Sequence, residues 1–214
     1  MKRIFLYVCE GSTDILFYQR VVDQVRQINP TKVFDDIVPP MNACGIGNFQ
    51  KWVKAQVRTL YLENLEEFPD STFTIALCRD HDVFKQQNPP VDWNRLVSEL
   101  HNMERVEKVV TVEAYDCIED LFLKDSKGIA RYLNREPIYV FQGSNGVEKI
   151  ENYFRSANKQ YLKGSYSSDF IDCLNIPKIM MDSCDSISQF CSLFGILKPC
   201  ALCLDFAHKV ENKQ

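Results

Sequence analysis

The sequence predicts an α/β fold, in which a four-stranded, mostly parallel sheet carries helices on both faces and a helical cap follows it. Short apolar runs typical of buried strands alternate with segments whose apolar residues recur at the helical period. Strands and helices that alternate along a chain form parallel sheets covered on both sides. Beyond about residue 125 only helical patterns follow, so we expect an α/β domain over residues 1–125 and a helical region packed on it over residues 126–214.

The first strand is expected at residues 3–9, where the chain is almost entirely apolar. Gly11 then turns the chain into a helix whose apolar positions continue to about residue 28. Ser12 or Thr13 is suited to cap this helix, and Asp14 falls in the first turn, where the helix dipole favours a negative charge.

The second strand is expected at residues 32–38, where apolar and polar residues alternate weakly before Pro39 and Pro40. A loop of small residues follows at 42–48. It opens a long helix over about residues 49–65, whose apolar positions recur with the helical period.

The third strand covers residues 72–78, and a loop separates it from a helix at about 93–102 that Asp92 is placed to cap. Residues 106–113 form the fourth strand, and a helix begins at residue 118. The cap is expected to consist of amphipathic or short helical pieces, which cover residues 147–158, 169–174, 176–181 and 187–194.

The bulk composition narrows the classes of function. With 214 residues, 45% of them hydrophobic, the chain can bury a sizeable core, and its net charge of -4 gives no broad basic surface for nucleic acid. No run of about 18 apolar residues indicates a membrane span. Four of the nine cysteines, Cys9, Cys44, Cys78 and Cys117, are widely spaced, as is typical of buried thiols in a reducing compartment, so the cytoplasm is the expected location. A zinc site at Cys200 and Cys203 is an alternative to ordinary packing.

Acidic residues follow the first and third strands at the point where each strand ends. Glu10 comes directly after the first strand, and Asp80 and Asp82 come after the third. The carboxyl ends of parallel strands share one edge of the sheet, where ligands bind in open α/β folds. Carboxylates crowded there repel one another unless a cation lies between them, and oxygen ligands suit Mg²⁺ or Mn²⁺. The sequence therefore predicts a metal-dependent phosphate site.

The order and spacing of these motifs resemble the TOPRIM domain. A strand followed by Glu-Gly-x-x-Asp, and a second strand ending in Asp-x-Asp about 70 residues later, are typical of that family over about residues 1–125. The family includes topoisomerases, bacterial primases, ribosomal RNA maturases and the OLD-family nucleases. Nothing here resembles the tyrosine-bearing domain of a topoisomerase or the zinc-binding region of a primase. The small stand-alone and OLD-family nucleases, often anti-phage defence effectors, are the better match.

That resemblance implies a role for each matching residue. Glu10 would be the general acid or base and a metal ligand together with Asp14 of the same motif, and Asp80 and Asp82 would bind Mg²⁺ or Mn²⁺. The segment after the fourth strand resembles the Ile-Glu element of these nucleases, which makes Glu119 a candidate ligand of a second metal. Tyr161-Leu-Lys-Gly164 resembles a basic element of some stand-alone members, which would make Lys163 a phosphate or transition-state contact.

Further candidates for phosphate or nucleic-acid contact are Gly11, Arg79, Gly45 and Gly47. The glycines precede helices whose free N–H groups can receive a phosphate, although tight turns alone also explain glycines there. For Arg79, an ion pair with an acidic neighbour is the favoured interpretation and phosphate contact is the alternative. His81 should point away from the aspartates that flank it, because side chains alternate along a strand.

The predicted function is Mg²⁺- or Mn²⁺-dependent hydrolysis of phosphodiester bonds in DNA or RNA. A separate ATPase partner is expected if ATP is involved, because the sequence contains no Walker A lysine motif. The acidic residues also fit simpler roles in helix capping and solvated turns. A non-catalytic module that binds a protein or nucleic acid is therefore the main alternative. A phosphatase- or response-regulator-like protein, with a strand-end aspartate as nucleophile, is a further one.

Overall fold

A computed structural model describes residues 1–85, 88–164 and 168–196. It confirms the α/β class: five parallel strands form one sheet in the order β2-β1-β4-β5, with β3 also paired to β1. The strands are β1 (Arg3–Cys9), β2 (Asp36–Ile37), β3 (Met41–Asn42), β4 (Thr72–Asp80) and β5 (Val106–Ala114).

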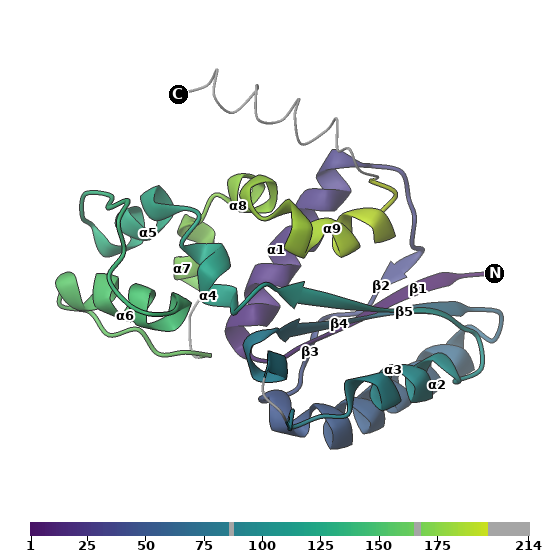
Figure 1. Ribbon diagram of the computed structural model, residues 1–214. Helices are drawn as coiled ribbons and strands as arrows, with labels where there is room; N and C mark the ends of the chain where they lie inside the picture. Colours follow the sequence, from purple (N-terminus) through teal and green to yellow (C-terminus); the bar gives the residue numbers. More distant parts are fainter. Residues whose placement is uncertain (86–87, 165–167, 197–214) are drawn as a thin grey trace.

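The α-helices before residue 125 are α1 (Ser12–Ile28), α2 (Lys54–Glu67), α3 (Trp93–His101) and α4 (Ile118–Phe122). Those after it are α5 (Ser126–Leu133), α6 (Gly146–Ser156), α7 (Ser168–Cys173), α8 (Ile176–Asp182) and α9 (Cys184–Leu193). Two 3₁₀ turns, η1 (Ile46–Asn48) and η3 (Asp82–Lys85), and one π-helical turn, η2 (Phe49–Val53), complete the described elements. α2 and α3 cover one face of the sheet, whereas α1 and α9 cover the other (Figure 1).

The predicted second strand differs most from the structure. Of the predicted residues 32–38 only Asp36–Ile37 form a strand, β2, which pairs with Ile4 and Phe5, and a further short strand that was not predicted, β3, pairs with Val8 and Cys9. Pro39 and Pro40 lie between β2 and β3, and proline has no N–H to donate to a strand ladder. The sheet therefore has five strands rather than four, although the two short ones share one edge of β1.

Two smaller predictions also need correction. Neither Ser12 nor Thr13 caps α1, because the helix begins at Ser12 with Gly11 in the N-cap position and no side-chain cap. Helix α5 was not predicted, and its eight residues include Gly128, which weakens a helical pattern. Asp92 does cap α3, where its side chain accepts a hydrogen bond of 3.0 Å from the backbone N–H of Arg95.

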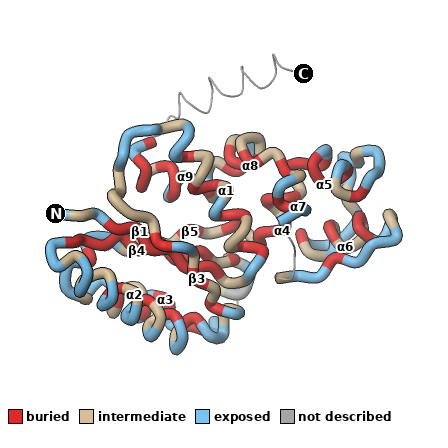
Figure 2. Tube along the Cα trace, turned by 180° about the vertical axis from the view of Figure 1, so that it is seen from behind, coloured by how far each residue is buried: buried red, intermediate tan, exposed pale blue. Residues whose placement is uncertain are grey.

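Strand alternation divides the core into two parts. On β1, Phe5, Tyr7 and Cys9 point to one face, and Ile4, Leu6 and Val8 point to the other. The central strands β1 and β4 are buried along nearly their whole length (Figure 2), as expected where a parallel sheet is covered on both faces, whereas β5 at the edge of the sheet alternates between buried and more exposed residues.

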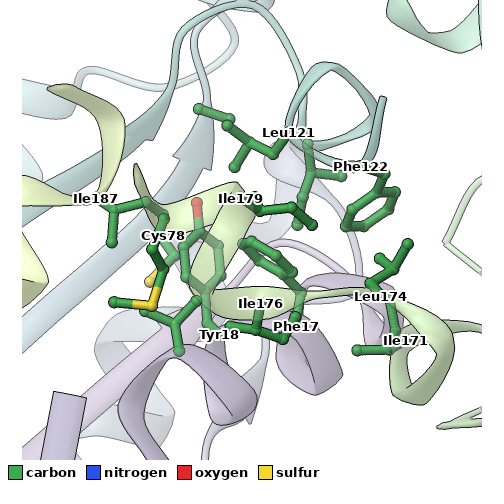
Figure 3. Close-up of a cluster of buried hydrophobic side chains, with 14 of the residues drawn as sticks. Phe17, Tyr18, Cys78, Leu121, Phe122, Ile171, Leu174, Ile176, Ile179 and Ile187 are labelled. Carbon is green, nitrogen blue, oxygen red and sulfur yellow. The ribbon is translucent and has the colours of Figure 1, made fainter. Parts of the chain in front are cut away.

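The larger core joins the sheet to the C-terminal helices. Phe17 and Tyr18 of α1 lie among side chains from β4, α4, α7, α8 and α9 (Figure 3). Phe190 of α9 is fully buried; its ring stacks on Tyr18 and meets Tyr7 edge to face. This core therefore draws residues from both sides of the predicted boundary at residue 125.

Cysteines of the described segments are all free thiols, and Cys9, Cys78 and Cys117 are buried. Cys200 and Cys203, the candidate zinc ligands, lie outside the described residues. Among the residues that the structure describes, no helix is long and apolar enough to cross a lipid bilayer.

Truncation of Phe190 tests whether the C-terminal helices and the sheet share one core. We expect Phe190→Ala to lower the free energy of unfolding by about 3–5 kcal/mol, because it leaves a cavity among buried rings. Urea unfolding followed by tryptophan fluorescence measures this change. The control Val140→Ala removes methyl groups that are 84% exposed and should stay within about 0.5 kcal/mol of the parent. A loss for Phe190→Ala as small as that of the control would contradict a shared core.

Candidate active site

The connections that follow the neighbouring strands β1 and β4 run in opposite directions across the sheet. From β1 the chain continues through α1 to the edge strand β2, whereas from β4 it continues through α3 to β5 on the other side. α1 packs in one core and α3 in the other, so the two connections also cover opposite faces. Such a switch point leaves a crevice at the carboxyl ends of the strands, where open α/β folds bind their ligands.

A cavity of about 340 Å³ lies at this switch point. Four acidic residues line it: Glu10 after β1, Asp14 in the first turn of α1, Asp80 at the end of β4, and Glu119 in α4 after β5. Lys163 is the one basic residue among the described residues that line the cavity. Segments far apart in the sequence thus bring four carboxyl groups and one ammonium group together.

Asp80 is held by contacts on both of its carboxylate oxygens. Oδ1 accepts a hydrogen bond of 2.9 Å from the backbone N–H of Ile118, and Oδ2 lies 3.2 Å from Nζ of Lys163. The side chain is only 4% exposed. Burial, and then the charge of Asp14, raise the pKa of Asp80 well above its ordinary value, despite the ammonium of Lys163.

Glu10 is tied to the end of the neighbouring strand. The backbone N–H of Asp80 favours the charged form of its carboxylate, whereas its Oε2 is buried and has no hydrogen-bond partner among the described residues. Burial raises the pKa of Glu10, and Lys163 and the Asp80 N–H oppose this change without cancelling it. One carboxylate oxygen therefore remains available for a ligand.

Asp14 is a buried acid whose pKa is strongly raised. Burial, and then the charge of Glu10, raise the pKa of Asp14 from 3.8 to about 7. A side chain at position 11 would place its Cβ 3.2 Å from Oδ2 of Asp14 and 3.9 Å from Cα of Gly164. Gly11 therefore lets the start of α1 approach both the carboxyl group and the segment that carries Lys163.

Glu119 is fully buried and is oriented by a residue from the helical region. Its Oε1 accepts a hydrogen bond of 2.9 Å from the hydroxyl of Tyr161. Its Oε2 lies 4.0 Å from Nζ of Lys163 and has no hydrogen-bond partner among the described residues. Burial lowers the pKa of Lys163, but the charges of Asp80 and Glu119 outweigh it and the net shift is upward.

The glycine loop after the edge strand forms one wall of the cavity. Asn42, Cys44 and Gly45 line it, and the Gly45 N–H donates a hydrogen bond of 2.8 Å to the carbonyl of Glu10. Gly45 has φ of +104° and Cys44 has φ of +56°, a region that non-glycine residues seldom occupy. Gly47, which was predicted as a phosphate contact with Gly45, does not line the cavity.

Arg79 does not line the cavity, so the structure does not bring it together with the predicted phosphate contacts Gly11 and Gly45. Alternation along β4 turns it to the face opposite Asp80, where its guanidinium pairs with Glu113 on β5. The guanidinium also lies over the rings of Phe84 and Trp93, at 3.7 and 4.1 Å from their centroids. The favoured interpretation, an ion pair with an acidic neighbour, is the one observed.

Asp82 is exposed and does not line the cavity, so the structure does not bring it together with the other predicted metal ligands. β4 ends at Asp80 and the chain turns into η3, so strand alternation no longer directs Asp82 to the same face. Its charge still contributes to the raised pKa of Glu10. His81 points away, as expected from alternation, and its Nδ1 lies 3.3 Å from Oε2 of Glu113.

The donor set fits a divalent cation by its chemistry. Carboxylate oxygens are the ligands that Mg²⁺ and Mn²⁺ prefer, and buried oxygens of Glu10 and Glu119 lack partners among the described residues. Within those same residues, no group of three or more acidic, histidine or cysteine side chains is arranged to hold a metal ion. The position between Asp80 and Glu119 is instead approached by the ammonium of Lys163.

Tyr161, Asn42 and Cys44 were not among the predicted site residues. Tyr161 lies two residues before Lys163, so the same motif contained a signal for it. Asn42 ends β3, a strand that the prolines concealed.

Comparison of the chain with protein-family models, with curated proteins and with solved structures found no match.

The raised pKa of Asp14 predicts a pH dependence of stability in the metal-free protein. Between pH 3.8 and about 7 the folded state holds a proton on Asp14 that the unfolded chain has lost, so stability falls as the pH rises through this window. Asp14→Asn removes this loss. In EDTA at pH 8 we expect its melting temperature to exceed that of the parent by at least about 2–4 °C, which 1 kcal/mol produces in a chain of this size.

The difference should shrink as the pH falls from 7 towards 4, because Asp14 is then neutral in the folded state. Asp23→Asn, on the same helix but with its side chain 47% exposed, is the matched control and should show no such trend. Parallel melting curves for the parent and Asp14→Asn across pH 4–8 would contradict the shifted titration.

Proposed function

We propose that the protein is a Mg²⁺- or Mn²⁺-dependent nuclease of the TOPRIM type, which hydrolyses phosphodiester bonds in DNA or RNA. The observation that supports it best is the meeting of Glu10, Asp80 and Glu119 in one cavity. These residues lie at or after the carboxyl ends of β1, β4 and β5, three neighbouring strands of the sheet. Capping or solvated turns would explain each acid separately, but they give no reason for buried carboxyl groups to face one another.

Glu10, Asp14, Asp80 and Glu119 are the residues proposed to hold the cation. A divalent ion bound to them would stabilise the charge that develops on phosphate oxygens during hydrolysis. Glu10 is the proposed proton carrier, because its Oε2 faces no partner among the described residues and its pKa is raised towards neutrality. Lys163, with its side chain 44% exposed, is suited to place a positive charge at the phosphate.

A non-catalytic binding module is the second candidate, and one observation favours it. No set of three metal-ligating side chains is assembled within the described residues, and Lys163 already pairs with Asp80. In that case the cavity would bind no metal ion. Its carboxylates would be paired with Lys163, or they would contact a basic group of a partner molecule. Thermal melting with Mn²⁺ separates the candidates, because a ligand that binds only the folded state raises its melting temperature by mass action.

Neutral isosteres at the cavity test the nuclease proposal. Glu10→Gln and Asp80→Asn are each expected to reduce Mn²⁺-dependent cleavage by at least about 100-fold, the lower range for loss of a general acid–base group. The assay is a panel of labelled single- and double-stranded DNA and RNA, with and without EDTA. Circular dichroism checks that both variants are folded.

Glu113→Gln, which removes an acid at the end of β5 but on the opposite face, is the matched control and should retain cleavage. Asp82→Asn separates the sequence prediction from the geometry. As an exposed residue outside the cavity, Asp82 should matter much less than Asp80. Cleavage that is equal in the parent, Glu10→Gln and Asp80→Asn would overturn the assignment.

A further inference from the structure

Charge is unbalanced in the cavity. Four carboxyl groups line it and Lys163 supplies the one positive side chain among the described lining residues. Burial penalises the charged form of a carboxyl group, and neighbouring carboxylates penalise it further. A cation between these groups, whether an ammonium group or a metal ion, would reduce their repulsion.

Lys163 is such a cation, and it follows closely after a buried residue of the same segment. Tyr161, two residues earlier, is buried; its ring meets Phe154 edge to face at 5.2 Å and its hydroxyl binds Glu119. The Lys163 side chain, in contrast, is 44% exposed, and its ammonium reaches Asp80 at 3.2 Å and Glu119 at 4.0 Å. Tyr161 is thus held by packing and a hydrogen bond, whereas the four-carbon side chain of Lys163 is partly exposed and has room to move.

The ammonium and a divalent ion would compete for the same oxygens. Asp80 Oδ2 is the oxygen closest to Nζ, and Glu119 Oε2 is a buried oxygen with no hydrogen-bond partner among the described residues. A cation bound to both oxygens would lie next to the ammonium, and like charges at such short range repel strongly in a buried site. Lys163 must leave Asp80 before these two oxygens can serve one metal ion.

We propose that Lys163 is a tethered counter-ion, which neutralises the carboxylates in the metal-free protein and is displaced from Asp80 when a divalent cation binds. The inference rests on the proposed metal site and adds to it a regulation of metal affinity. Because the tether at Tyr161 holds the backbone, the released ammonium stays at the rim of the cavity. There it is free to pair with a phosphate of the substrate instead.

Replacement of the ammonium by an apolar group of similar length tests the competition. Lys163→Met should bind Mn²⁺ roughly tenfold more tightly than the parent by isothermal titration calorimetry, a factor that corresponds to about 1.4 kcal/mol of lost competition. Its metal-free form should melt at a lower temperature, and Mn²⁺ should raise that temperature more than it does for the parent.

Lys159→Met is the matched control, because it removes the same charge four residues away. Nζ of Lys159 donates a hydrogen bond of 3.0 Å to the carbonyl of Tyr132, outside the cavity. Its Mn²⁺ affinity should equal that of the parent. Asp80→Asn in the Lys163→Met background should lose the tight binding, which assigns the Mn²⁺ to this cavity.

A second measurement uses the unaltered protein and so does not depend on the folding of a variant. Acetic anhydride labels free lysine amines, and peptide mass spectrometry reports the rate at each position. Saturating Mg²⁺ should speed the labelling of Lys163 severalfold relative to EDTA, because the ion pair with Asp80 is broken, whereas Lys159 should be labelled at the same rate in both.

The outcomes distinguish this inference from the proposed function. Equal or weaker Mn²⁺ binding by Lys163→Met, with labelling of Lys163 unchanged by Mg²⁺, would overturn the counter-ion while leaving the metal site in place. Absence of Mn²⁺ binding in both the parent and Lys163→Met would overturn the metal site and the counter-ion together. Tighter binding that persists in the double variant with Asp80→Asn would also overturn the competition at this cavity.

Discussion

Repulsion among buried carboxyl groups is the constraint on which the arrangement of this protein depends. The fold brings Glu10, Asp14, Asp80 and Glu119 to one cavity, where low exposure weakens the screening that water provides. Such a cluster persists only if protons or cations reduce its charge. Raised pKa values for Asp14 and Asp80, and the contact of Lys163 with Asp80, are three responses to the same electrostatic cost.

The two faces of the sheet manage charge differently, and strand alternation explains why. On the face of α1, Asp80 continues the row of Ala76 and Cys78 and meets the acidic cavity. On the face of α3, Arg79 stands opposite Glu113 in register and forms a conventional ion pair between aromatic rings. One residue along a strand therefore separates an ion pair of opposite charges from a cluster of acidic side chains.

The sequence predicted the fold well where hydrophobic patterns are strong and less well where local chemistry overrides them. Three of the four predicted strands were placed to within two residues, because apolar runs between turn residues are unambiguous. Of the predicted second strand only Asp36–Ile37 was found, β3 after Pro39 and Pro40 was not predicted, and the short helix α5 had too few turns to reveal its period. In the site, Arg79 was a candidate phosphate contact because strand alternation was not applied to it. Alternation did predict that His81 points away from Asp80.

The contacts that the helical region makes with the cavity could not be derived from hydrophobic periodicity. They determine which carboxylates of the cavity are hydrogen-bonded or paired with a positive charge. Tyr161 and Lys163 lie more than 40 residues from Glu119 in sequence, and no spacing rule links them; a family resemblance had to suggest Lys163. The long-range contacts of the fold place the ammonium group of Lys163 beside the carboxylates of Asp80 and Glu119. An ammonium group relieves repulsion without satisfying every oxygen, so the metal-free site is stable enough to fold while oxygens of Glu10 and Glu119 keep an unmet capacity for ligands. A helical region that merely covered the sheet with apolar side chains would leave the carboxylates protonated or splayed apart. Lys163 is therefore the contact through which the helical region lowers the net charge of the acidic cavity.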